Sequence, residues 1–141
     1  MNDFDHTTTG TGRIKLTRPK KLNSLSNEMI HDLTKVYTDF QTTGKLASVW
    51  LEGEGRAFCA GGDVDAIRTA ILDGTSTLPQ DFFYDEYKLN HLIASLNIPH
   101  NSIWDGFVMG GGVGLSVHGT YRVCTENTMF AMPETAIGLF P

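Results

Sequence analysis

The sequence lacks any long hydrophobic run. No apolar stretch in its 141 residues approaches the roughly 20 residues that a helix needs to cross a bilayer, so we expect no membrane segment and no membrane partner. The first twelve residues, MNDFDHTTTGTG, have neither the basic patch and apolar run of a signal peptide nor the arginine-rich character of a mitochondrial transit peptide. We therefore expect a cytoplasmic protein in which residues 1–12 are disordered or poorly ordered.

Cysteine is also scarce. Cys59 and Cys124 lack CxxC spacing, which argues against a zinc site or a disulfide framework, and their apolar sequence neighbours predict two reduced thiols in the core. The five histidines show no HExxH pairing, and Asp63 and Asp65 lack the later ligands of an EF-hand loop. Helix capping is the better interpretation of Asp63. We predict no metal site.

Positive charge is in the minority, with 11 lysines and arginines against 16 acidic residues and a net charge of -5. An acidic surface repels phosphates, so we expect no nucleic-acid partner. Arg18, Lys20 and Lys21 nevertheless crowd the stretch LTRPKKLNSLS. Taken alone, this cluster is most simply a solvated loop.

The sequence does contain alternating strand and helix patterns over a length of about one domain or a piece of one. Apolar spacing predicts strands over 13–17, 47–53, 101–112, 121–125 and 128–133. It predicts helices from an N-cap at Ser26 to Phe40, through 67–71, over 81–97 and over 115–118. The expected fold class is α/β with crossover connections.

Glycine is concentrated in two segments, CAGGD at 59–63 and MGGGVG at 109–114, each where a strand gives way to a helix. Backbone N–H groups are free at such junctions, and two of them aimed at one carbonyl oxygen form an oxyanion hole. The alternative is that these glycines only permit tight turns and close helix packing. Neither segment has the spacing of a phosphate-binding GxxxxGK[ST] or GxGxxG loop.

Two further side chains could carry chemistry. Ser116 in GLSVH partly matches the GxSxG nucleophile elbow, but His118 replaces the last glycine, so an α/β-hydrolase serine is a weaker alternative. Glu134 follows a strand and a proline, and partial burial would suit it to proton transfer or to attack on a carbonyl. A helix-capping role for Glu134 is an open alternative. The apolar residues expected around Glu134 are Phe130, Met132, Ile137 and Leu139.

Four segments, RPKKLNSLS, RAFCAGGDV, MGGGVGLS and AMPETAIGLFP, resemble in this order the signatures of the crotonase superfamily, the enoyl-CoA hydratase/isomerase family. FFYDEYKLN and GLSVHGTYRV are similar to its 3-hydroxyisobutyryl-CoA hydrolase branch. The resemblance implies a crotonase-like spiral of strand–strand–helix units over 13–141, truncated before the C-terminal helices. It also implies an acyl-CoA substrate, no cofactor beyond the coenzyme A of that substrate, and a homo-oligomer with the family's trimer contacts.

The resemblance also implies a site. Gly62 and Gly111 would supply the oxyanion N–H groups, Glu134 would be the nucleophile or the base for water, and Glu86 would lie near the substrate and bind its hydroxyl. The basic loop would face the phosphates of coenzyme A. The further substrate contacts implied are Lys21, Leu22, Ser24, Ala60, Asp63 and Val64.

The implied reaction is hydrolysis of an acyl-CoA thioester, with 3-hydroxyisobutyryl-CoA from valine breakdown as the favoured substrate. Hydratases of the family carry a first glutamate where this sequence has Gly114, so hydratase or isomerase activity is the less favoured alternative. In the hydrolase branch an aspartate follows GLFP, but here the sequence ends at Pro141. A truncated, inactive fragment is therefore the other alternative.

Overall fold

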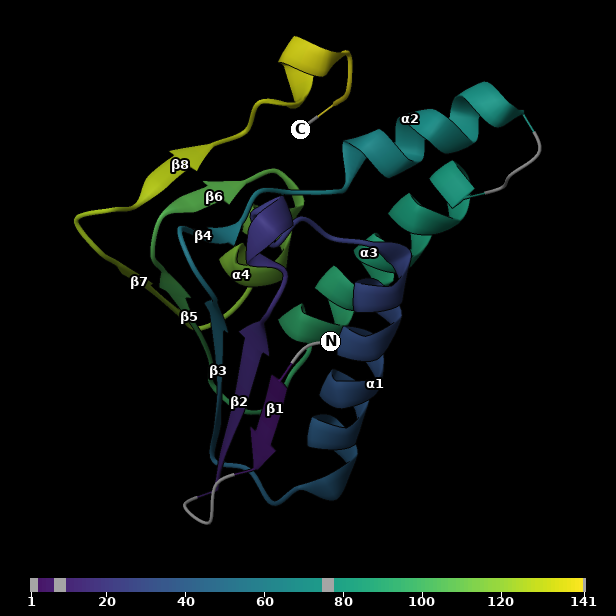
Figure 1. The fold of residues 1–141 in the computed structure, drawn as a ribbon. Coiled ribbons are helices and arrows are strands. Elements are labelled where there is room, and N and C mark those ends of the chain that lie inside the picture. Colours follow the sequence, from purple (N-terminus) through teal and green to yellow (C-terminus); the bar gives the residue numbers. More distant parts are fainter. Residues whose placement is uncertain (1–2, 7–9, 75–77, 141) are drawn as a thin grey trace.

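A computed structural model describes residues 3–6, 10–74 and 78–140, which form two β-sheets and the helices packed on them (Figure 1). Within these residues the larger sheet has the order β1-β2-β3-β5-β7, and the smaller one has the order β4-β6-β8. β1 is antiparallel to β2, and the other pairs are parallel. The strands are β1 Asp3–His6, β2 Thr11–Leu16, β3 Ser48–Gly53, β4 Ala57–Cys59, β5 His100–Trp104, β6 Phe107–Met109, β7 Tyr121–Cys124 and β8 Met129–Ala131.

The chain follows a spiral. A strand of the larger sheet, a strand of the smaller sheet and a helix succeed one another as β3-β4-α2, β5-β6-α4 and β7-β8-η2. Helices α1 and α3 lie side by side along the larger sheet (Figure 1). This is the strand–strand–helix architecture that the resemblance predicts. The helices are η1 Pro19–Lys21, α1 Asn27–Thr43, α2 Val64–Asp73, α3 Leu78–Ala94, α4 Gly111–Val117 and η2 Glu134–Ile137.

The predicted patterns account for the first elements of the core. In β2, Ile14 and Leu16 are fully buried between more exposed neighbours, as strand alternation requires. The predicted N-cap is confirmed, because the Ser26 hydroxyl accepts a hydrogen bond from the Met29 N–H at the start of α1. The buried face of α1 then recurs at helical spacing through Met29, Ile30, Leu33, Tyr37 and Phe40.

The strand predicted over 101–112 is wrong as a single element. The chain turns at Asp105 and Gly106, so β5 joins the larger sheet and β6 joins the smaller one. Gly106 has a φ of 78°, and a Cβ there would collide with the carbonyl oxygen of Arg56. The Asp105 carboxylate secures the turn by accepting hydrogen bonds from Thr125 Oγ1 and Asn127 Nδ2.

The helix predicted over 115–118 starts earlier than expected, at Gly111. The glycine run is therefore part of α4. A Cβ on Gly112 would lie 2.8 Å from the Cys59 Cβ and would overlap the Cys59 carbonyl oxygen, so glycine lets α4 pack directly on β4. Close helix packing, the alternative interpretation of the glycines, therefore applies at this position.

We predict that Gly112→Ala destabilises the fold by about 1–3 kcal/mol, because the new methyl group overpacks a junction made of backbone atoms. Alanine normally stabilises a helix interior relative to glycine by up to about 1 kcal/mol, so the predicted sign is opposite to that of helix propensity. Urea unfolding followed by circular dichroism measures the change. Lys35→Ala is the control, since Lys35 is exposed on α1 and the change introduces alanine into a helix without adding a methyl group to a packed junction. A neutral or stabilising Gly112→Ala would contradict the packing argument.

The expectation of a poorly ordered N-terminal segment needs correction. β1 occupies Asp3–His6 and β2 begins at Thr11, so these residues form strands rather than a poorly ordered segment. Residues 1–2 and 7–9 of the predicted disordered segment lie outside the described residues.

The two cysteines differ in burial. Cys59 is a buried core thiol, as expected, and burial raises its pKa to about 12. Cys124 is exposed instead, because all four residues of β7 are exposed at the end of the larger sheet.

Candidate active site

A pocket of about 450 Å³ lies at the carboxyl ends of β4 and β6, between α2, α3, α4 and the segment that contains η2. Both predicted glycine segments open into it. Six of the ten predicted site residues line this pocket, although they come from four separate parts of the chain. They are Ala60, Gly62, Val64, Glu86, Gly111 and Glu134.

The two glycine segments are in contact. A Cβ built on Gly61 would lie 3.2 Å from the Met109 carbonyl oxygen and 3.5 Å from the Gly111 nitrogen. Gly61 also has a φ of 97°, which a residue with a side chain rarely adopts. Bare backbone at this point is therefore what allows the second segment to approach the first.

The backbone N–H groups of Gly62 and Gly111 are available in this pocket. The Leu25 N–H donates to the Gly61 carbonyl at 2.7 Å, and the Asp63 N–H donates to the Leu25 carbonyl at 2.8 Å. In such a parallel bridge the N–H of the middle residue, Gly62, is directed away from Leu25. Gly111 is the first residue of α4, where the N–H has no acceptor within the helix. In the described part of the chain, neither N–H has a backbone acceptor.

Two carboxyl groups flank the second glycine segment. Glu86, on α3, is only 5% exposed, and a Cβ on Gly111 would collide with its Oε1. The second is Glu134, because a Cβ on Gly110 would come within 2.9 Å of its Oε1. Glu134 Oε2 is buried, and no described residue hydrogen-bonds to it. Glycines 110 and 111 thus make room for both carboxyl groups.

The Glu86 carboxyl has a displaced pKa. Burial is the main cause that raises the pKa of Glu86 to about 7, and the negative charge of nearby Glu134 adds to it. A carboxyl group with this pKa can hold or release a proton near neutral pH. Strong pKa displacement of this kind in a pocket is typical of functional sites.

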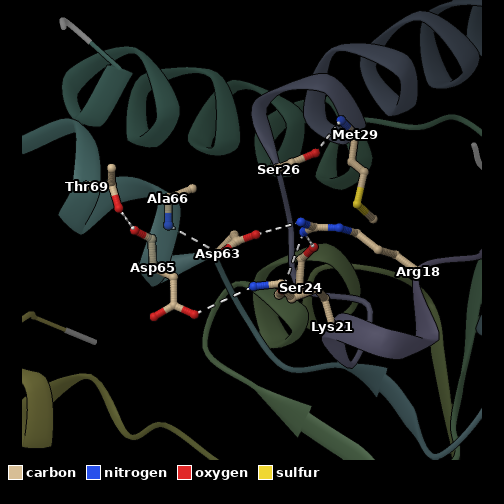
Figure 2. Close-up of polar contacts among 9 residues, drawn as sticks. All are labelled: Arg18, Lys21, Ser24, Ser26, Met29, Asp63, Asp65, Ala66 and Thr69. Atoms are coloured by element: carbon tan, nitrogen blue, oxygen red, sulfur yellow. Dashed lines mark hydrogen bonds and ion pairs between the residues drawn. The ribbon is translucent and has the colours of Figure 1, made fainter.

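The loop that contains Arg18 and Lys21 is joined by ion pairs to Asp63 at the end of the first glycine segment and to Asp65 at the start of α2 (Figure 2). Arg18 Nη2 lies 2.7 Å from Asp63 Oδ2, and its Nη1 donates to the Ser24 carbonyl at 2.9 Å. The guanidinium is therefore engaged within the protein by Asp63 and Ser24. Lys20 and Lys21 are exposed, and Lys21 Nζ is 3.6 Å from the exposed Asp65 carboxylate. Their expected contact with coenzyme A stays a prediction.

The remaining predicted substrate contacts lie beside the first glycine segment. Asp63 is the N-cap of α2, as predicted, and accepts a hydrogen bond from the Ala66 N–H. Burial opposes ionisation of Asp63, but the hydrogen bonds from Arg18 and Ala66 outweigh it and lower its pKa. The Leu22 carbonyl accepts from the Ala60 N–H at 3.0 Å. The residues that lie beside the segment and do not line the pocket are Lys21, Leu22, Ser24 and Asp63.

The serine alternative is not supported by the geometry. Ser116 is fully buried in α4, where its hydroxyl accepts from Trp104 Nε1 at 3.0 Å and lies 2.9 Å from the Gly112 carbonyl oxygen. A hydroxyl held in this way cannot meet a substrate.

The pocket also contains residues that the sequence analysis did not predict as site residues, among them Asn90 and His118. Asn90 follows Glu86 by four residues, and this helical spacing was the signal available for it.

These features define the class of protein. The strand–strand–helix spiral brings two glycine segments together at its edge. Their free N–H groups lie in a pocket that also contains carboxyl groups, as the resemblance implies. Residues 11–141 match the enoyl-CoA hydratase/isomerase family, and the chain belongs to this family.

Curated relatives are similar over nearly the whole chain. 3-Hydroxyisobutyryl-CoA hydrolase 1 of Arabidopsis thaliana is 50% identical over 128 residues, which are 91% of this chain and 34% of that protein. Mitochondrial 3-hydroxyisobutyryl-CoA hydrolase of Gallus gallus is 49% identical over 133 residues, which are 94% of this chain and 34% of that protein. The chain thus spans about a third of the length of these relatives.

Solved structures confirm the fold. An enoyl-CoA hydratase from Rhodobacter sphaeroides 2.4.1 superposes with a TM-score of 0.93 at 37% identity, covering 99% of this chain and 42% of that one. A carnitinyl-CoA dehydratase from Mycobacterium thermoresistibile gives a TM-score of 0.91 at 41% identity, over 99% and 41% of the two chains.

Other expectations are tested less fully. Among the helices in the described part of the chain, none is long and apolar enough to span a membrane. The same residues contain no group of three or more His, Cys, Asp or Glu side chains that could hold a metal ion. Cytoplasmic location, homo-oligomer formation and the absence of a cofactor stay predictions.

Proposed function

We propose that this chain forms the acyl-thioester site of a coenzyme A thioester hydrolase, with 3-hydroxyisobutyryl-CoA as the favoured substrate. The observation that carries the proposal is that Gly62, Gly111 and Glu134 line one pocket, although they lie on separate parts of the chain. The names of the Arabidopsis and chicken relatives support the choice of acyl group.

In this proposal the thioester carbonyl oxygen accepts hydrogen bonds from the two glycine N–H groups. Negative charge grows on that oxygen as the carbonyl carbon becomes tetrahedral, so two fixed donors lower the barrier more than they strengthen substrate binding. Each donor of this kind contributes on the order of 100-fold or more in rate. The contact between the glycine segments supports this role, because it brings the residues that would supply both donors close together.

Glu134 carries the nucleophilic step. It either removes a proton from the attacking water or attacks the carbonyl carbon itself, giving an anhydride that water then cleaves. In both routes the carbon–sulfur bond breaks, the coenzyme A thiolate leaves and takes up a proton, and water supplies the new carboxyl oxygen. The unpaired Oε2 of Glu134 supports this role, since no described residue engages that carboxylate oxygen with a hydrogen bond.

Release of free thiol from 3-hydroxyisobutyryl-CoA tests the proposal. We expect the 141-residue chain, once circular dichroism shows that it is folded, to release one thiol for each thioester hydrolysed. Hydration of a 2-enoyl-CoA by the same preparation measures the hydratase alternative, which we expect to be much slower because position 114 is glycine. A folded chain that hydrates the enoyl thioester but releases no thiol would contradict the proposal.

A further inference from the structure

Asn90 is another polar side chain that lines the pocket, and the proposed hydrolysis does not use it. Asn90 lies one helical turn beyond Glu86 on α3, and Gly114 lies one turn beyond Gly111 on α4. A Cβ on Gly111 would collide with Glu86 Oε1, and a Cβ on Gly114 would come within 2.6 Å of Asn90 Nδ2. The two α3 side chains therefore fill the two spaces that glycine leaves on α4.

The Asn90 amide has an unmet hydrogen-bonding requirement. Its Oδ1 is buried, and no described residue donates a hydrogen bond to it. A buried acceptor without a partner is unfavourable by about 1–3 kcal/mol, so such groups in native proteins call for an explanation. Because Asn90 lines the pocket, a rotation of its side-chain amide brings Oδ1 to the pocket, where a ligand can supply the missing donor.

The position of Asn90 relative to Gly111 indicates which ligand group it meets. In the proposed site the thioester carbonyl is held at Gly111, and residues three apart on a helix lie roughly 5–6 Å from one another. A substituent on C3 of the acyl group is separated from the carbonyl carbon by three single bonds of about 1.5 Å each. A C3 hydroxyl can therefore reach the neighbourhood of Gly114, where the Asn90 amide lies.

We propose that Asn90 determines acyl specificity by accepting a hydrogen bond from the 3-hydroxyl group of the substrate at its Oδ1, an inference that rests on the function proposed above. A hydroxyl also has acceptor lone pairs, so its oxygen can accept from the protonated carboxyl of Glu86 on the adjacent turn. Gly114 is then explained by the space that Asn90 needs. An acyl group without the hydroxyl leaves Oδ1 unpaired and is rejected for that reason.

The test compares 3-hydroxyisobutyryl-CoA with isobutyryl-CoA, which differs only by the hydroxyl. We expect the wild-type chain to favour the hydroxylated thioester in kcat/KM, and Asn90→Leu, which keeps the shape of the side chain, to lower that preference by about 10-fold to 100-fold. Asn90→Ala provides a second variant without the amide. Asn97→Leu is the matched control, because Asn97 is exposed just beyond α3 and should keep the wild-type preference.

Binding provides a readout that does not depend on turnover. Calorimetry with the nonhydrolysable thioether analogues of the two substrates should show the same loss of preference in both Asn90 variants. If thiol release fails but the wild-type chain prefers the hydroxylated analogue and the Asn90 variants do not, the specificity proposal stands while hydrolysis fails. Equal preference in the wild-type and variant chains, or no binding of either analogue, overturns the specificity proposal.

Discussion

Glu134→Gln is expected to reduce thioester hydrolysis by about 10²- to 10⁴-fold, the range typical of removing a positioned acid–base group. The amide that replaces the carboxylate can neither take a proton from water nor attack the carbonyl carbon. Its shape is nearly the same, so the binding of a nonhydrolysable thioester should remain within a few-fold of wild type. Thiol release measures the first quantity, and calorimetry measures the second.

Glu126→Gln is the control for this change. Glu126 is exposed in the turn between β7 and β8, eight residues before Glu134, and it also loses one negative charge in the variant. Turnover by Glu126→Gln should equal that of the wild type. If Glu134→Gln also hydrolyses the thioester at the wild-type rate, Glu134 is not the acting carboxylate and the proposed mechanism is wrong.

The second large effect concerns the pH dependence of stability, where two buried groups oppose each other. His100 is 1% exposed, and burial lowers its pKa from 6.5 to about 4. Its Nε2 lies 2.7 Å from the Tyr37 hydroxyl, whose pKa burial raises, and its Nδ1 has no partner among the described residues. As the pH falls from about 6.5 to 4, the unfolded chain binds a proton that the folded chain refuses, so His100 removes about 3 kcal/mol of stability.

Glu86 acts in the opposite direction. Its pKa is raised from 4.5 to about 7, so the folded chain keeps a proton that the unfolded chain loses as the pH rises through this range. Glu86 therefore removes about 3 kcal/mol of stability as the pH rises from about 4.5 to 7. Over the shared window from about 4.5 to 6.5 the two contributions nearly cancel.

We therefore expect the free energy of unfolding of the wild-type chain to be nearly constant across this window, whereas each single variant is not. In His100→Gln stability should fall as the pH rises, and in Glu86→Gln it should rise, each by up to about 3 kcal/mol. Urea unfolding at a series of pH values measures both slopes. Substitution of the exposed His91 by glutamine should leave the profile flat. Parallel slopes in the two variants would contradict the opposed protonation of these groups.

Local patterns in the sequence determined most of the secondary structure and the family. The alternation of Ile14 and Leu16 and the cap at Ser26 depend only on neighbouring residues, so their elements could be predicted within a few positions. The glycine segments and the segment around Glu134 were recognisable for a similar reason, because each is a short stretch that resembles a signature of the enoyl-CoA hydratase/isomerase family, which residues 11–141 match.

Tertiary contacts decided the features that the sequence left open or misplaced. The division of β5 from β6 depends on the close approach of Gly106 to Arg56, 50 positions away in the sequence, and the engagement of Arg18 depends on Asp63. Helical spacing places Glu86 and Asn90 on one face of α3, but no local pattern indicates that this face would meet the glycines of α4. Burial, and with it the displaced pKa of Glu86, results from packing between segments distant in sequence, so only the three-dimensional structure decided it.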